Sequence, residues 1–267
     1  MESFRLKNIV IIILVILNLF LAALLVNYRL QGARARQNLL DELNSLFAAN
    51  AISLSEDLEL DTPPLSSLSV QRNLEDEANI AAMLLGESAE PQHQGGGIYS
   101  YTGALGTVHF RSGGNFDYAP VNQSVEDPQA FFDQFCNNYG YHPAEVLSDD
   151  AGTSYIATQY LGENAIYNCT VMIQFLGDKL LSVSGSYVST ASTTASPTAL
   201  TAVDALVQLL DYRNATGMVC NSIQEIKPVY ELQSGPSAAL QLIPKWQITA
   251  DAYQYYVDCS TGDVFRA

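Results

Sequence analysis

The chain has 267 residues, of which 28 are Asp or Glu and 12 are Lys or Arg, so its formal net charge is −16 at pH 7. Hydrophobic residues make up 48% and aromatic residues 10%, a composition that favours an ordered fold over disorder. From residue 37 onward only seven bases accompany 27 acids. This balance excludes nucleic-acid binding, because such a surface cannot neutralise phosphates.

An apolar run over residues 9–26, interrupted only by Asn18, stands near the start of the chain. In a helix such a run covers roughly 27 Å, close to the ~30 Å hydrocarbon core of a bilayer, and a secretory h-region is shorter, about 7–15 residues. The pattern therefore predicts a retained membrane-spanning helix over residues 9–27, preceded by a tail over residues 1–8. Cleavage at Ala33-Arg-Ala35 is the less favoured alternative.

Asn18 lies near the middle of the predicted span, where an unpaired carboxamide is costly and an interhelical hydrogen bond would satisfy it. We therefore expect a helix–helix contact through Asn18, with Leu14 and Leu21. The alternative is that Asn18 bonds to its own helix backbone or faces lipid.

The charges that flank the span do not settle its orientation. Arg5 and Lys7 precede it, whereas Arg29, Arg34 and Arg36 follow it. The positive-inside rule alone would thus place the body of the protein in the cytoplasm, by a bias of a single charge.

Residues 28–97 are predicted to form a helical stalk and a linker. One helix is indicated by apolar residues at helical spacing, and a second by a similar pattern over residues 74–85. Pro63-Pro64 separates the two, because consecutive prolines disfavour a helix. The segment 87–97, with Pro91 and three consecutive glycines, is typical of a flexible linker. The residues of the first helix are Leu39, Leu40, Leu43, Leu46 and Phe47.

The remainder predicts two α+β units, residues 98–195 and 196–267, each with a helix followed by antiparallel strands. Asp127-Pro128 and Ser196-Pro197 are typical helix starts. The second helix would bury Val203, Leu206, Val207 and Leu210.

The strands of both units are predicted by alternation. In the first unit, alternation places Tyr167, Cys169, Val171, Ile173 and Phe175 on one face, and Leu181, Val183 and Tyr187 on one face after a Gly177-Asp178 turn. In the second unit, strands are predicted by the alternation of Leu240, Leu242, Trp246 and Ile248 and then of Tyr253, Tyr255 and Val257, and a Thr261-Gly262-Asp263 turn leads toward Val264 and Phe265.

The four cysteines, Cys136, Cys169, Cys220 and Cys259, show no Cys-x-x-Cys spacing, which gives little support to a zinc or redox motif. They are candidates for disulfides that pair Cys136 with Cys169 and Cys220 with Cys259. Ordinary buried thiols are an equally good interpretation.

The sequence offers little that suggests catalysis. The three histidines, His93, His109 and His142, have no adjacent nucleophile motif, and the chain has no phosphate-binding or dinucleotide fingerprint. We therefore expect neither an enzyme nor a bound metal or cofactor. The minority alternative is an envelope hydrolase with carboxylates at Asp149 and Asp150, although these residues are more simply explained as solvated surface.

Aromatic residues near the C-terminus admit two interpretations. Tyr253, Tyr255 and Tyr256, with Trp246, could form a platform for a sugar or a peptide. Alternation places Tyr256 opposite the other two tyrosines, which favours core packing of one face and light exposure of the other.

The N-terminal sequence Ile16-Leu-Asn18-Leu-Phe-Leu21, preceded by Arg5-x-Lys7, resembles the start of YycI-type regulators of the Wal (YycG) sensor-kinase system. The C-terminal sequences Pro244-Lys-Trp246-Gln-Ile248 and Tyr256-Val-Asp258-x-x-Thr-Gly262-Asp-Val264 are similar to that family and to its relative YycH. The four cysteines depart from the family pattern.

This resemblance implies a single-pass protein of the cell membrane, with a cytoplasmic N-terminus and an extracytoplasmic body. It implies that the protein adjusts a sensor histidine kinase of the YycG or WalK type through protein contacts, together with a YycH-like partner. The C-terminal pattern also resembles PepSY-like domains. The alternative function is therefore a wall-facing module that binds a peptide or a protease along an exposed strand edge.

Overall fold

The computed structural model describes residues 18, 21, 38–193, 199–234 and 239–266, and divides the chain into two compact units, residues 1–55 and 56–267. In the first unit, residues 38–49 form a helix, as the leucine spacing predicts, and a short strand, β1, follows at Ser53–Leu54. The helix ends where the Asn50 amide donates to the Phe47 carbonyl at 3.0 Å and Ala51 adopts a left-handed φ of 57°.

The predicted membrane span of residues 9–27 lies outside the described residues except for Asn18 and Leu21, which are both helical. Leu14 also lies outside them. In the part of the chain that the structure describes, no helix combines the length and the apolar character needed to cross a bilayer.

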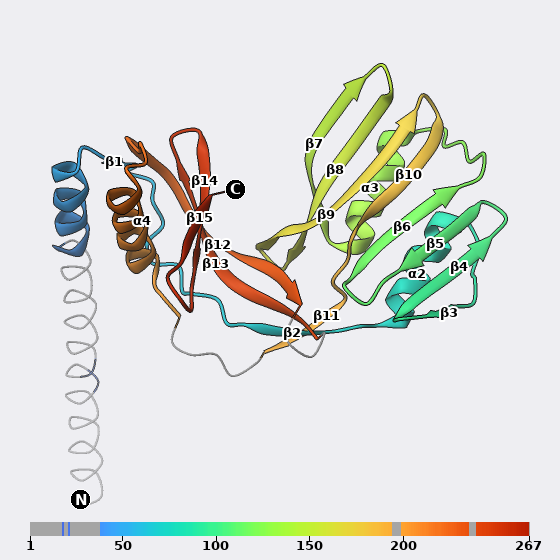
Figure 1. Ribbon diagram of the computed structural model, residues 1–267, viewed down its shortest axis with the longest axis horizontal. Helices are drawn as coiled ribbons and strands as arrows, with labels where there is room; N and C mark the ends of the chain where they lie inside the picture. The colour runs from blue at the N-terminus through green and yellow to red at the C-terminus, as the bar shows by residue number, and fades with distance from the viewer. Residues whose placement is uncertain (1–17, 19–20, 22–37, 194–198, 235–238, 267) are drawn as a thin grey trace, which may run out of the picture. The chain divides into compact units, whose positions relative to one another are not determined.

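The second unit begins with a long antiparallel sheet in the order β3-β4-β5-β6-β10-β9-β8-β7 (Figure 1). Helix α2 (Leu74–Leu85) contacts β4 and β5, and α3 (Pro128–Tyr139) contacts β7 and β8. Both helices contribute to one core with the inward residues of the strands, among them Ile80, Leu84, Tyr101, Phe116, Phe135 and Ile173. The strands are β3 (Gln92–Gly95), β4 (Ile98–Gly103), β5 (Gly106–Phe110), β6 (Asn115–Pro120), β7 (Tyr141–Asp149), β8 (Gly152–Leu161), β9 (Asn164–Leu176) and β10 (Lys179–Ser186).

Local capping fixes where α2 and α3 begin and end. The Asn73 side chain accepts a hydrogen bond from the Glu75 amide at 3.0 Å, and the Asp127 side chain accepts one from the Ala130 amide at 3.0 Å. Each helix ends at a left-handed glycine, Gly86 or Gly140. The helix predicted over residues 74–85 and the helix predicted after Asp127 are confirmed.

The predicted stalk and linker over residues 28–97 needs correction. Helix α2 belongs to the core of the first sheet, and residues 92–95 form β3, which pairs with β4. Gly95, Gly96 and Gly97 form the turn of a hairpin. Their φ values are 90°, 59° and 76°, in a region of backbone conformation that other residues rarely adopt. The boundary predicted at residue 97 therefore falls inside a β-hairpin.

The second sheet of this unit has the order β11-β2-β13-β12, and β14 and β15 extend it from another part of β13. Helix α4 (Ala202–Thr216) contacts β13, β14 and β15. Trp246 is fully buried in β13 and donates its indole N–H to the Leu200 carbonyl at 2.8 Å. The strands are β2 (Leu68–Gln71), β11 (Thr190–Thr193), β12 (Ser222–Ser234), β13 (Leu240–Ala250), β14 (Tyr253–Asp258) and β15 (Val264–Arg266).

Helix α4 differs in detail from the prediction. The Ser196-Pro197 start lies outside the described residues, and the helix as described begins at Ala202 with Thr201 as its N-cap. Of the predicted apolar stripe, Leu206 and Leu210 are buried. Ala202, Ala205 and Leu209 complete the buried face in place of Val203 and Val207.

Two irregularities change the predicted pattern of the strands. The Gly177-Asp178 turn joins β9 to β10 as predicted, but the register shifts between Leu180 and Ser182. Leu180 is consequently buried and Leu181 is 40% exposed, so the inward position predicted for Leu181 was wrong. In addition, β9 and β12 pair in parallel, with Ile166 opposite Tyr230, so the two sheets are joined at this point.

Candidate functional site

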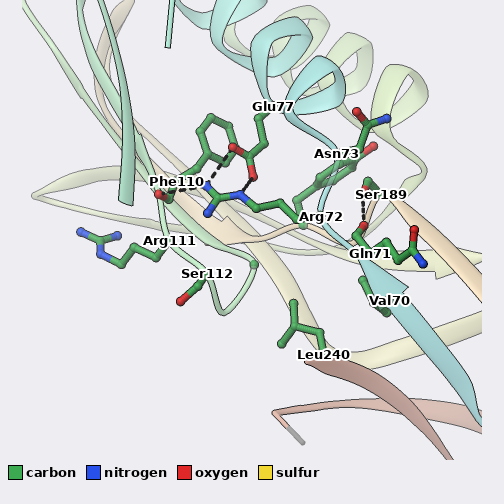
Figure 2. Close-up of a pocket in the computed structure, with 12 residues that line it drawn as sticks. Val70, Gln71, Arg72, Asn73, Glu77, Phe110, Arg111, Ser112, Ser189 and Leu240 are labelled. Atoms are coloured by element: carbon green, nitrogen blue, oxygen red, sulfur yellow. Dashed lines mark hydrogen bonds and ion pairs between the residues drawn. The ribbon is translucent and has the colours of Figure 1, made fainter. Parts of the chain in front are cut away.

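Arg72 follows β2 directly, and its guanidinium group makes several hydrogen bonds (Figure 2). Its guanidinium donates to both carboxylate oxygens of Glu77, at 2.6 and 3.0 Å, to the Gly97 carbonyl at 2.5 Å and to the Phe110 carbonyl at 3.4 Å. It also lies 4.6 Å from the centre of the Tyr99 ring. The adjoining cavity measures about 20 Å³, enough for roughly one water molecule. This cluster ties β2, α2 and β5 together and leaves no room for a larger ligand.

Glu77 is only 6% exposed. Burial raises the pKa of its carboxyl above the usual value, and the hydrogen bond and charge of Arg72 only partly offset that rise. Arg111, which pairs with Asp117, is instead nearly half exposed. Arg72 is thus a structural cation, whereas Arg111 belongs to the surface.

A second charged cluster surrounds Lys245, which is 4% exposed in the middle of β13. Its ammonium nitrogen lies 2.6 Å from a carboxylate oxygen of Asp258 and 3.0 Å from one of Glu231, and 5.1 Å from the centre of the Phe265 ring. Burial alone would lower the pKa of Lys245, but the hydrogen bonds to Asp258 and Glu231 prevail and raise it. The charge is therefore held in place by β12, β13 and β14 together.

Asp258 also organises the last turn of the chain. It accepts hydrogen bonds from the Ser260 amide at 2.8 Å and from the Thr261 amide at 3.0 Å. Burial would raise the pKa of Asp258, but the bonds from Lys245 and from these amides lower it below its ordinary value. The predicted turn at Thr261-Gly262-Asp263 is present, with Gly262 at a φ of 78°.

Three aromatic rings are stacked on the sheet face that carries Lys245. The ring centres of Tyr167 and Tyr256 are 4.0 Å apart, and those of Tyr256 and Phe265 are 5.5 Å apart, with both pairs inclined at 22°. Burial, with the neighbouring Glu231 carboxylate, raises the pKa of Tyr167. The stack covers the central part of the sheet and leaves Tyr256 only 4% exposed.

The predicted tyrosine platform is accordingly divided between two faces. Trp246 and Tyr255 are buried on the face that packs on α4, as the core-packing interpretation predicts. Tyr256 is buried within the aromatic stack on the opposite face. Tyr253 is half exposed and lies under the guanidinium of Arg266, at 4.8 Å from its ring centre.

Strand β7 forms an open edge of the first sheet. Within the described chain it pairs with β8 alone, and every residue after Tyr141 is exposed, including Val146 at 52% and Leu147 at 48%. A register shift between Pro143 and Glu145 interrupts the ladder. An open edge with apolar side chains on both faces is a suitable surface for a protein or peptide contact.

The other predicted site residues are dispersed. Asn18 and Leu21 are helical, and Leu21 is 49% exposed. Asp149 caps the β7–β8 turn by accepting from the Ala151 amide at 2.8 Å, and Asp150 is exposed beside it. Among the described residues, no group of three or more His, Cys, Asp and Glu side chains is placed to bind a metal ion. The histidines lie apart, with His93 near Tyr99, His109 in β5 and His142 stacked on Tyr160.

All four cysteines are free, buried thiols, so the predicted pairings are not formed in this structure. Cys136 lies in α3 and Cys169 in β9, where its thiol lies 3.1 Å from Gln159 Oε1. Burial raises the pKa of Cys136, Cys169 and Cys259 to about 12, which makes these thiols unreactive.

Sequence reasoning gave no role to Arg72, Glu231 or Lys245. A signal for Lys245 was present, because a lone lysine stands between Leu242 and Trp246 in a strongly apolar strand. A charge in that position requires a buried partner. The partners themselves, on other strands, could not be identified from spacing.

Neither a family model nor a curated protein matches the sequence. Similar solved structures include an uncharacterized protein from Eubacterium rectale ATCC 33656, at 10% identity over 87% of this chain and 99% of that chain, with a TM-score of 0.48. The Bacillus megaterium YpeB C-terminal domain is similar at 9% identity, over 77% and 99%, with a TM-score of 0.40. YycH from Bacillus subtilis is similar at 12% identity, over 77% of this chain and 51% of that chain, with a TM-score of 0.38. At these scores the likeness assigns no function.

Proposed function

We propose that this protein is a non-enzymatic regulator, anchored in the cell membrane through residues 9–27, with its body outside the cytoplasm. It adjusts a sensor histidine kinase of the YycG or WalK type through protein contacts, together with a YycH-like protein. Contacts that favour one kinase conformation over another shift the populations of the two, and a difference of about 1–3 kcal/mol is sufficient.

The observation that carries this proposal is the assembly around Lys245. The C-terminal sequences that resemble YycI-type regulators are separated along the chain, yet their residues Lys245 and Asp258 form one buried ion pair at 2.6 Å. Tyr256 from the same sequences lies in the aromatic stack. The resemblance thus concerns buried residues that hold the second sheet together, so it extends to the folded body of the protein and supports a regulator of this type.

Crosslinking in native membranes tests the kinase contact. A photoreactive residue placed beside Asn18 in the full-length chain is expected to capture a membrane helix of a histidine kinase. Asn18→Leu is expected to reduce this capture, whereas Asn18→Gln, which keeps the carboxamide, is expected to preserve it. Capture that is unchanged by Asn18→Leu would contradict a role for this amide, and the absence of any kinase among the captured proteins would contradict the proposal.

The orientation has its own test. A reporter enzyme that is active only outside the cytoplasm, fused after Ala267, is expected to be active. An inactive fusion at normal expression, with activity restored by a cytoplasmic reporter at the same position, would reverse the topology.

The exposed edge of β7 favours a second candidate, a PepSY-like module that binds a peptide or a protease by adding a strand to the sheet. Val146→Asp combined with Leu147→Asp changes two exposed side chains and is expected to abolish peptide capture by the full-length chain while leaving its stability within about 0.5 kcal/mol. If this variant captures the kinase as well as the wild type does, the first candidate is favoured.

A further inference from the structure

A groove is lined by residues of β8 and by residues on the face of the second sheet that carries the aromatic stack. Its main cavity measures about 640 Å³ and is lined by Thr158, Tyr160 and Tyr167 on one side and by Lys227 and Gln247 on the other. A neighbouring cavity of about 230 Å³ shares Tyr160, Ala165 and Lys227 with it, so the two adjoin. Cavities of this size accommodate small ligands or short chain segments.

Gln247 is the exceptional residue of this groove. It is only 8% exposed, and within the described part of the chain its carboxamide has no hydrogen-bond partner, yet its oxygen and nitrogen are not among the fully enclosed atoms, so the carboxamide is open to the cavity. Two other buried glutamines are fully bonded. Gln159 exchanges two bonds of 2.8 Å with the backbone of Val188, and Gln123 accepts from the Tyr118 hydroxyl at 2.6 Å. A carboxamide that has no protein partner and opens into a cavity, on a side chain that is otherwise enclosed, is suited to bind a ligand.

The charge of the groove selects the ligand. Glu145 lines the main cavity, and Glu59 and Glu163 line the neighbouring one. Lys227 is partly neutralised by Glu225, 3.2 Å away. Three carboxylates and one ammonium group thus line the two cavities, which disfavours anionic ligands and favours basic side chains.

The covered ring faces of the groove favour a peptide over a glycan. A carboxamide donates and accepts at once, which matches the N–H and C=O of a peptide backbone. A glycan would stack on open ring faces, but Tyr256 is enclosed between Tyr167 and Phe265, and one face of Tyr160 is covered by His142 at 4.0 Å.

We infer that this groove binds an extended, basic peptide segment whose backbone pairs with the carboxamide of Gln247 and whose basic side chains lie against Glu145, Glu59 and Glu163. The site goes beyond the proposed kinase regulation and does not depend on it. It also differs from strand addition at the edge of β7, because it uses side chains of the groove.

The test uses the full-length chain in detergent and a fluorescent nonapeptide that alternates lysine and alanine, with binding followed by fluorescence anisotropy. The wild type is expected to bind this peptide and to lose affinity as salt is raised. Gln247→Leu removes two hydrogen bonds and is expected to weaken binding about tenfold. Gln241→Leu, on the same strand but outside the groove, is the matched control and is expected to bind as the wild type does.

Glu145→Lys, at an exposed position, provides a second variant that does not disturb the core and is expected to weaken binding several-fold. The inference is overturned if the wild type does not bind the peptide up to millimolar concentration, or if Gln247→Leu and Glu145→Lys both bind it unchanged. Equal or tighter binding of a nonapeptide that alternates glutamate and alanine, or of a neutral oligosaccharide, would likewise overturn it.

Discussion

Lys245 and Trp246 are neighbours in β13 and are almost equally inaccessible, although one is charged and the other apolar. Both are accommodated because alternation sends Trp246 toward α4 and Lys245 toward Asp258 and Glu231. Removing one member of such a cluster leaves a buried charge with too few partners, which is costly.

Replacement of Asp258 tests the ion cluster through its pH dependence. Asp258→Asn is expected to destabilise the protein by about 2 kcal/mol at pH 7. The folded-state pKa of Asp258 is lowered, so its contribution is present above the unfolded value of about 4 and is lost as pH falls through the folded pKa. The difference between variant and wild type should therefore shrink below about pH 4. Urea unfolding followed by the fluorescence of Trp246, the single tryptophan, measures it. A difference that is constant from pH 7 to pH 3 would contradict the assignment.

Arg72 provides a test of geometry at the scale of one residue. Arg72→Lys keeps the charge but cannot reproduce a fork that contacts Glu77, Gly97 and Phe110, so we expect a loss of about 1–3 kcal/mol. Arg72→Ala should cost more, about 3–5 kcal/mol, because Glu77 remains buried without its partner. The matched control is Arg111→Ala at an exposed ion pair, which should cost no more than about 1 kcal/mol. Equal losses at the two arginines would contradict the structural role of Arg72.

At the scale of the element, helix α4 depends on a reciprocal cap. The Asp204 amide donates to the Thr201 hydroxyl at 3.2 Å, and the Thr201 amide donates to the Asp204 carboxylate at 3.0 Å. Thr201→Ala is expected to cost about 1 kcal/mol in urea unfolding, and Thr201→Ser, which keeps the hydroxyl, only a few tenths. An alanine variant as stable as the wild type would show that the cap does not stabilise this helix.

Helices and turns that are marked by capping or turn residues in the sequence were predicted correctly. Features that depend on pairing with strands distant in the sequence were not. The bounds of α2 follow from Asn73 and Gly86, and the β9–β10 turn from Gly177-Asp178. In contrast, the three glycines at 95–97 have the composition of a linker, and only the pairing of β3 with β4 makes them a turn. The inward position of Leu181 failed because the bulge lies between Leu180 and Ser182, so Leu180 is buried in its place and the predicted alternation resumes at Val183.

At the scale of the whole molecule, the α+β class was predictable from the alternation of helical and strand periods. The connection between the two sheets was not, because it depends on a parallel pairing between Ile166 and Tyr230, which are distant in sequence. The same limit applies to the candidate sites. The sequence signals that Lys245 needs a buried partner but not which one, and it gives no signal for Gln247, because both depend on residues of the surrounding strands.

The central claim, that this protein acts on a sensor histidine kinase by contact, is tested most directly by the autophosphorylation rate of the kinase in native membranes. The rate is measured with the full-length chain present, deleted, and restored with Asn18→Leu as the variant. Coupling of about 1–3 kcal/mol predicts a change of roughly 5–150-fold on deletion and a partial change with Asn18→Leu. A rate that is the same with and without the chain, at equal kinase abundance, would contradict the account.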